Sequence, residues 1–287
     1  MCCRRIWLRL LAGIAFALTT ACLPASGQAK RCLPLRSTSV AGLSFRGGEK
    51  FTFAAHYKWG PVNSDVAKVY VTLDSTQVGG VPVYHCRVFG QTARFYDMFF
   101  KVREDFQSWF TCDGLRPVRF TRDTREGSYT CTNKYRYVRN VAEPYIAASV
   151  KTSRKGAYSA RIPLTDCTYD IPSLFYMARN IDFSKIREGD NHPITFAIDE
   201  DTYTIGFIYR GKAERKVSGV GTVRCHLFSV GVVAGNVFPE NADIQLWISD
   251  DDNRIPVWFE TPINPGTVQG RLQSWSGLKY PFNALVK

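Results

Sequence analysis

The sequence lacks the short motifs that mark common enzyme classes. No serine lies in a GxSxG elbow, no cysteine has the neighbouring signature of a thiol protease, and the four histidines form no HExxH pattern. Residues 206–212 have the glycine and lysine spacing of a phosphate-binding loop, but Ala213 stands where that loop needs Ser or Thr, and no helical pattern follows. We therefore favour a binding protein over an enzyme, with an unrecognised hydrolase built from distant residues as an alternative.

Long hydrophobic runs are also scarce. The apolar run at residues 6–18 is shorter than the roughly 20 residues of a membrane helix, and no later segment approaches that length without charges. Three arginines precede or enter this run and small residues follow it, as in a cleavable secretory signal. We expect residues 1–29 to be that signal, with cleavage after Ala29, and the mature chain to be a soluble protein of the periplasm without a transmembrane helix.

Cysteine usage permits disulfides without requiring them. Cys22 resembles the lipid-attachment site of bacterial lipoproteins, but Thr19 occupies the position where that motif has an aliphatic residue, so an outer-membrane lipoprotein is the less favoured alternative. A mature chain of 258 residues (287 − 29) is long enough to build its core without bridges. We expect at most one or two disulfides, and spacing does not choose the pairs. The mature cysteines are Cys32, Cys86, Cys112, Cys131, Cys167 and Cys225.

Acidic residues are fewer than basic ones. The formal charge is +12, and removal of the three signal-peptide arginines leaves +9 (12 − 3). A basic surface that faces the bacterial envelope indicates anionic partners such as acidic glycans or lipid headgroups, and export argues against nucleic acid as a physiological partner. The sequence indicates no cofactor.

The basic residues are concentrated between residues 116 and 139. Lys134 and Arg136 alternate with Tyr135 and Tyr137, so the two cations should share one face of a strand and the two tyrosines the other. An ordinary solvated face of a sheet is the alternative to an anion-binding surface. The candidate binding residues are Arg119, Arg122, Lys134 and Arg136.

Alternating apolar and polar residues predict β-strands along most of the chain, and short connections make successive strands antiparallel neighbours. The exception is residues 170–180, where Asp170 can cap a helix and Pro172 occupies its first turn. The predicted fold is all-β, a mostly antiparallel large curved sheet or partly open β-barrel with one short helix near 170–180, in a single domain over residues 30–287. The predicted strands cover residues 45–59, 66–73, 81–89, 94–110, 117–122, 128–139, 145–151, 158–162, 193–210, 220–233, 244–249 and 255–260.

The strands at residues 244–249 and 255–260 are joined by a turn of three aspartates and an asparagine, side chains that bond to their own backbone. We expect Asp250 to accept backbone amide hydrogen bonds in this turn and Arg254 to offset the clustered carboxylates. Pro256 begins the return strand, where a missing amide is tolerated. These residues would then form a structural turn that serves folding rather than catalysis.

Pairs of metal-ligand residue types occur at two positions, His85 with Cys86 and Cys225 with His226. Neighbours on a strand point to opposite faces and do not easily share one ion, so no metal site is predicted. The acidic residues 199–201 and 250–252 are contiguous, whereas a calcium loop alternates its ligands. We interpret both acidic runs as turns, with weak cation binding as the alternative.

Several residues along the mature chain match a known signature. Those near the C-terminus are Trp247, Ser249, Asp250, Arg254, Pro256, Gly266 and Leu272. Those before it are Phe45, Gly48, Glu49, Trp59, Gly60, Ala67, Asp105, residues 170–179 and Gly189. In combination they resemble the DUF3108 family of exported bacterial proteins, particularly its Bacteroidetes members. The resemblance implies an exported, β-rich protein, and it implies no catalytic residue because the family has no established activity.

These observations favour a non-enzymatic envelope protein that binds an anionic glycan or lipid component. The alternative is a periplasmic carrier that shields an apolar ligand in a barrel cavity, because strands rich in Phe, Tyr and Val could line one. The sequence makes no prediction of the oligomeric state.

Overall fold

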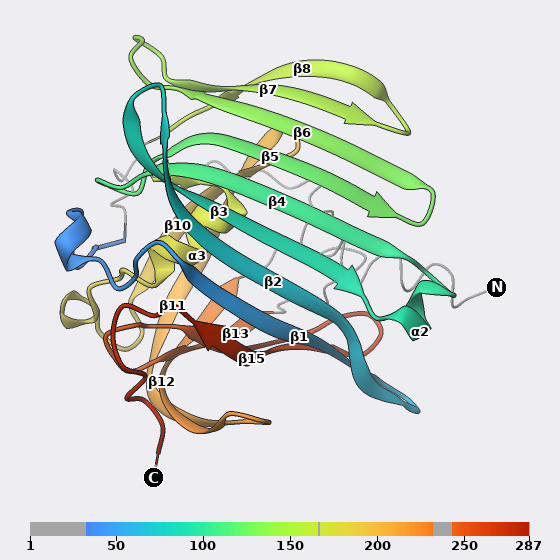
Figure 1. Cartoon of the computed structure of the whole chain (residues 1–287), viewed down its shortest axis with the longest axis vertical. Coiled ribbons are helices and arrows are strands. Elements are labelled where there is room, and N and C mark those ends of the chain that lie inside the picture. The colour runs from blue at the N-terminus through green and yellow to red at the C-terminus, as the bar shows by residue number, and fades with distance from the viewer. Residues whose placement is uncertain (1–32, 166, 232–242, 287) are drawn as a thin grey trace.

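The computed structural model describes residues 33–165, 167–231 and 243–286. In this part of the chain, fifteen strands form one strongly curved sheet (Figure 1). The prediction of an all-β, mostly antiparallel curved sheet with one short helix near residues 170–180 is confirmed. The predicted signal peptide, Cys22 and Cys32 lie outside the described residues.

The strands of the first half are β1 (Glu49–Trp59), β2 (Val62–Val78), β3 (Val81–Thr92), β4 (Val102–Thr111), β5 (Pro117–Glu126), β6 (Tyr129–Val138), β7 (Tyr145–Thr152) and β8 (Gly156–Pro163). Those of the second half are β9 (Thr168–Tyr169), β10 (Asn191–Ile198), β11 (Asp201–Val217), β12 (Gly221–Gly231), β13 (Asp243–Ser249), β14 (Pro256–Pro262) and β15 (Thr267–Ser276). The helices are α2 (Arg94–Asp97) and α3 (Ile171–Ala178), with 3-10 turns η2 (Val40–Gly42) and η3 (Phe183–Lys185).

The two halves of the chain meet at the pairing of β1 with β15. This antiparallel pair runs from Lys50 opposite Ser276 to Lys58 opposite Thr267. From β1 the strands follow in sequence order to β8, and from β15 they follow in reverse order to β9. Neighbouring strands are antiparallel, as short connections require, except that β9 is parallel to β10. The sheet therefore has β8 and β9 as its edges.

Tight turns set the register of the long hairpins. Gly79 and Gly80 connect β2 to β3 with φ angles of 57° and 79°, a left-handed conformation that glycine adopts without a side-chain clash. Val78 then pairs with Val81, and the register continues without a shift to Ala67 opposite Thr92. The hairpin predicted around these glycines is confirmed.

Two predicted strands are interrupted in the structure. Residues 94–110 were expected to form one strand, but α2 and a turn occupy its first part and β4 begins at Val102. The reason is local: the amide of Asp97 donates to the carbonyl of Ala93, and the Asp97 side chain pairs with Arg103. Residues 193–210 form β10 and β11 because Asp199, with φ of 56°, reverses the chain.

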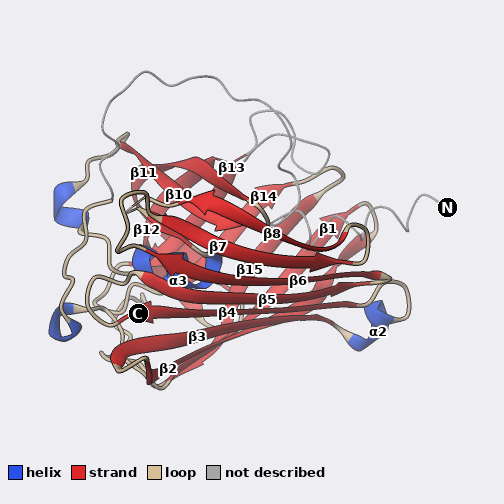
Figure 2. Ribbon diagram, turned by 90° about the horizontal axis from the view of Figure 1, so that it is seen from above, coloured by secondary structure: helices blue, strands red, loops and turns tan. Residues whose placement is uncertain are grey.

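Helix α3 lies on the inner side of the curved sheet and packs against β3, β4 and β10 (Figures 1 and 2). Its cap is as predicted: Asp170 accepts from the amide of Ser173, and the Ser173 hydroxyl accepts from the amide of Asp170. Burial raises the pKa of Asp170 to about 6, against the effect of its hydrogen bonds. The helix therefore carries a buried, hydrogen-bonded carboxyl into the core.

A buried ion pair ties α3 to β1. Arg179, at the C-terminal end of α3, donates to both carboxylate oxygens of Glu49 at 2.5 and 3.0 Å, and both side chains are fully buried. Arg179 also donates to the carbonyls of Asn253 and Ser44. Its guanidinium lies over the ring of Phe45. The side chain of Arg179 thus connects β1 and the segment before it to α3 and to the β13–β14 turn.

The described cysteines fall into two groups. Cys167 is disulfide-bonded, whereas Cys86, Cys112, Cys131 and Cys225 are free. Three of the free thiols, those of Cys86, Cys131 and Cys225, are buried. Neither α2 nor α3, nor any other helix of the described chain, has the length and apolar character needed to cross a bilayer.

Candidate functional site

The predicted basic residues lie on β5 and β6, but they do not share one face. Arg119, Lys134 and Arg136 are exposed on the outer face of the sheet, and Tyr135 is buried on the inner face, as the alternation predicts. Arg119 lies directly opposite Arg136, and Thr121 lies opposite Lys134. Three of the four predicted residues therefore form one surface.

Arg122 is the exception, and its assignment to the basic surface is wrong. It is three residues from Arg119, an odd interval that turns it to the inner face of β5, where its side chain is 2% exposed. Arg122 donates to Asp199 at 2.9 Å and lies 3.8 Å from Glu104. Its charge is compensated inside the fold and cannot bind an outside anion. The alternation of Phe120 and Arg122 on one face was the sequence signal for this.

The outer face carries a row of residues in cross-strand register. The row runs from β3 to β8 through His85, Trp109, Arg119, Arg136, Ala147 and Arg161. Arg161 is a third exposed arginine of this row and was not among the predicted residues. Adjacent strands lie about 4.8 Å apart, so Arg119 and Arg136 are direct neighbours, and Arg161 lies two strands beyond Arg136 with Ala147 between them.

Aromatic rings hold two of these arginines in place. The rings of His85 and Trp109 are stacked, with centroids 4.4 Å apart, and the guanidinium of Arg119 lies 4.8 Å from the Trp109 ring. The guanidinium of Arg161 lies 3.7 Å from the ring of Tyr145. Stacking restricts the rotamers of both arginines before any ligand arrives.

The row is electrostatically unbalanced. Like charges directly opposite each other on neighbouring strands are destabilising, and Arg119 faces Arg136 in this way. Within the described chain, no acidic side chain forms an ion pair with Arg119, Lys134, Arg136 or Arg161. The surface formed by the three arginines of the row and by Lys134, two residues from Arg136 on β6, is called the outer basic row below.

The inner face of the same strands carries a polar cluster that sequence reasoning missed. Glu104 accepts from Thr124, which in turn accepts from Arg122 at 2.7 Å, and Asp199 accepts from Asn133 at 3.0 Å. Burial, followed by the charge of Glu104, raises the pKa of Glu126 to about 8. Two adjacent carboxyls at a buried site, here Glu104 and Glu126, are expected to share one proton. Asp199 comes from the distant β10–β11 turn, so no local pattern revealed the cluster.

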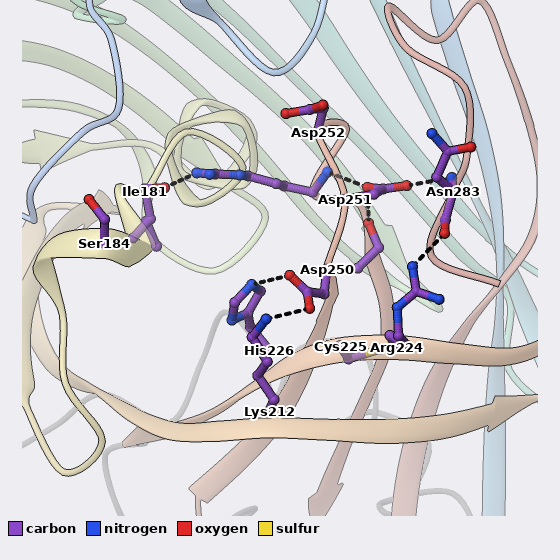
Figure 3. Close-up of polar contacts among 12 residues, drawn as sticks. Ile181, Ser184, Lys212, Arg224, Cys225, His226, Asp250, Asp251, Asp252 and Asn283 are labelled. Atoms are coloured by element: carbon purple, nitrogen blue, oxygen red, sulfur yellow. Dashed lines mark hydrogen bonds and ion pairs between the residues drawn. The ribbon is translucent and has the colours of Figure 1, made fainter. Parts of the chain in front are cut away.

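The closing turn between β13 and β14 is a structural turn, but Asp251 rather than Asp250 holds it. Asp251 accepts from the amides of Asn253 and Arg254, at 3.1 and 3.0 Å, and from the hydroxyl of Ser249. It also accepts from the amide of Asn283, which ties the C-terminal segment to the turn (Figure 3). The expectation that Asp250 accepts these amides is wrong, because Asp250 points to β11 and β12 instead.

Arg254 and Pro256 have different roles in this turn. Arg254 donates to the carbonyl of Ile181 and lies over the ring of Phe183, and it forms no ion pair with a described carboxylate. It therefore attaches the turn to the segment after α3. The predicted offset of the clustered carboxylates is limited to electrostatic attraction by Asp250 and Asp252, without a direct ion pair. Pro256 is the first residue of β14, as expected, and pairs with Ile248.

Asp250 belongs to a chain of hydrogen bonds with His226. One carboxylate oxygen lies 3.0 Å from Nε2 of His226, and the other accepts from Lys212 at 2.8 Å (Figure 3). Nδ1 of His226 lies 2.9 Å from the hydroxyl of Tyr209. The ring is stacked on Phe183 with centroids 3.8 Å apart. Burial lowers the pKa of His226 to about 4, so the imidazole is neutral at pH 7.

The hydrogen-bonded arrangement of Asp250, His226 and Tyr209 resembles part of a hydrolase triad but cannot act as one in this geometry. A general base needs one ring nitrogen on the carboxylate and the other on a nucleophile. The second nitrogen of His226 is bonded to Tyr209, and burial raises the pKa of that phenol, which disfavours the phenolate. The arrangement stabilises the turn and offers no activated Ser or Cys.

Metal-ligand residue types form pairs but no larger group in the described part of the chain. Cys86 is buried while His85 stacks on Trp109 on the outer face, so this pair is split between faces as predicted. Over residues 33–165, 167–231 and 243–286, no group of three or more His, Cys, Asp and Glu side chains could hold a metal ion.

Comparisons with known proteins place the chain in a family. A solved structure similar to this chain is the crystal structure of a β-barrel-like protein of the domain of unknown function DUF1849 from Brucella abortus, with 9% identity and a TM-score of 0.49. The match covers 85% of this chain and 99% of that one. No curated protein matches. The model of DUF3108, described as a protein of unknown function, matches residues 52–273, and the chain therefore belongs to the DUF3108 family.

Proposed function

We propose that the protein is a non-enzymatic component of the bacterial periplasm and that its outer basic row binds an acidic glycan of the cell envelope. The observation that carries this proposal is the direct opposition of Arg119 and Arg136 without a described acidic partner. A fold that retains such repulsion gains from an anion that bridges the two guanidinium groups. Guanidinium groups bind carboxylates and phosphates in a planar, two-point geometry.

The distribution of the four cations over β5, β6 and β8 supports a polymer rather than a single small anion. Arg119 and Arg136 lie on adjacent strands, Lys134 lies two residues along from Arg136, and Arg161 lies two strands away. A chain with repeating acidic groups can contact all four cations at once, which increases its overall affinity without a deep pocket. We do not propose the apolar carrier, because α3 packs on the inner side of the sheet where such a ligand would lie.

Binding to polygalacturonate, with neutral dextran as the comparison polymer, tests the proposal. The wild-type protein should bind the acidic polymer at low salt and lose affinity steeply as salt rises to about 0.15 M, where the Debye length is about 8 Å. The triple variant Arg119→Gln, Lys134→Gln and Arg136→Gln should bind at least about tenfold more weakly.

A matched control separates this surface from net charge. The control variant Arg187→Gln, Arg210→Gln and Lys216→Gln also removes two arginines and one lysine, but from exposed positions outside the outer basic row. This variant should keep most of the affinity. Equal losses in both variants would show that net charge alone drives binding, and the proposal would then fail.

A further inference from the structure

The connection between β3 and β4 exposes a cluster of large apolar side chains. Phe95, Met98 and Phe99, on and after α2, are 60%, 73% and 63% exposed. No other Phe, Met, Leu or Ile of the described chain is exposed to this degree. Contiguous exposed apolar groups in a water-soluble fold mark an interaction surface. This cluster is called the α2 tip below.

The tip is held rigidly although it protrudes from the end of the sheet (Figures 1 and 2). The amide of Ala93 donates to the carbonyl of Val66, and the hydroxyls of Tyr96 and Ser64 are hydrogen-bonded, so β2 supports one side. Phe100 is buried, and any side chain at Gly127 would collide with it, so the β5–β6 turn supports the other side. The exposed rings therefore do not reach the core by a small rearrangement.

The charge around the tip is positive. Arg103 forms a two-point ion pair with Asp97, with distances of 2.6 and 3.0 Å, so the acidic residue of α2 is already neutralised. Arg94 and Lys101, which flank the apolar residues, are exposed and have no ion-pair partner within the described chain. The tip thus presents aromatic and Met side chains between two uncompensated cations.

We propose that the α2 tip inserts into the headgroup region of an anionic lipid surface. A convex apolar projection fits a fluid interface, which needs no shaped pocket, and the flanking cations complement acidic headgroups. Phe is among the side chains that interfacial helices bury at the boundary between headgroups and acyl chains. This function is separate from glycan binding on the outer basic row, and it would keep the protein at a membrane while the row contacts a polymer.

Flotation of the purified protein with lipid vesicles tests the proposal. Vesicles of phosphatidylcholine mixed with phosphatidylglycerol should carry the protein upward, and pure phosphatidylcholine vesicles should carry much less. The variant Phe95→Ser, Met98→Ser and Phe99→Ser should partition at least about tenfold less into the anionic vesicles. The control Val40→Ser, Val81→Ser and Val141→Ser also removes three exposed apolar side chains, outside the tip, and should partition as the wild type does.

A second variant keeps the test decisive if the serine substitutions disturb folding. Arg94→Gln with Lys101→Gln leaves the apolar side chains in place and should lower partition into anionic vesicles about fivefold for each cation, without changing partition into neutral vesicles. Wild-type protein that does not float, or serine variants that float normally, would overturn the proposal. Self-association of the wild type that the serine variants abolish, without vesicle binding, would identify a second copy of the chain as the occupant and also overturn it.

Discussion

The two faces of β5 and β6 place arginines in opposite environments. On the inner face, Arg122 is nearly fully buried and contacts Asp199, Glu104 and Thr124. On the outer face, Arg119 is exposed and faces Arg136. A buried charge is tolerated when it is paired, whereas water screens an exposed charge without a partner. The inner arginine is therefore committed to the fold, and the outer ones stay available to a ligand.

The largest expected effect distinguishes these two arginines directly. Arg122→Ala should lower the free energy of unfolding by about 3–5 kcal/mol, because Asp199 and Glu104 lose their buried counterion. Arg119→Ala should change it by no more than about 0.5 kcal/mol. Urea denaturation of both variants measures the difference. If both variants lost a similar amount of unfolding free energy, the inner and outer arginines would contribute equally to stability, and the comparison would fail.

The buried carboxyl of Glu126 should make stability depend on pH. Its pKa is raised from 4.5 to about 8, so between these values the folded protein holds a proton that the unfolded chain has released. The contribution of Glu126 to stability is full below pH 4.5 and should fall by up to about 4 kcal/mol as the pH rises to 8.

Denaturation of Glu126→Gln across this pH range checks the prediction. The amide cannot ionise, so this variant should lose much of the decline in stability between pH 5 and pH 8. Asp123→Asn, on the exposed face of the same strand, is the control and should keep the wild-type slope. An unchanged slope in Glu126→Gln would contradict the assignment of a raised pKa to this residue.

The closing turn offers a smaller contrast between two neighbouring aspartates, both partly exposed, of which Asp251 holds the turn and Asp250 contacts β11 and β12. Asp251→Ala should cost about 2 kcal/mol, since three hydrogen bonds within the turn are lost, and Asp250→Ala about 1 kcal/mol. Thermal melting measures both. Calcium should not change the melting temperature of the wild type. A calcium-dependent rise that disappears in Asp250→Ala would instead identify a cation site.

The smallest expected effect has the opposite sign. Arg136→Thr removes one of two facing cations and should raise the free energy of unfolding by up to about 0.5 kcal/mol at low salt. A double-mutant cycle with Arg119→Thr isolates the repulsion. High salt should remove the gain. A loss of stability in Arg136→Thr at low salt would mean that the outer basic row stabilises the sheet.

Local chemistry was readable in the sequence wherever neighbours along the chain set the structure. Gly79 with Gly80 predicted a hairpin, and Asp170 with Pro172 predicted the start of α3, because turns and caps depend on a few adjacent residues. The exposure of Lys134 and Arg136 followed from strand alternation. In the closing turn the same reasoning located the bend but chose the wrong aspartate, since three neighbouring carboxylates are equivalent until the strands around them are placed.

Contacts between distant segments were decided by the tertiary structure. Arg122 and Asp199 are separated by 77 positions, and Arg179 and Glu49 by 130. Strand alternation gives the face of a residue but not the segment opposite that face, so it does not name the partner of a buried charge. Arg161 joined the outer basic row only because β6, β7 and β8 pair in register. The pairing of β1 with β15 joins the two halves of the sheet, and no pattern within one segment encodes that contact.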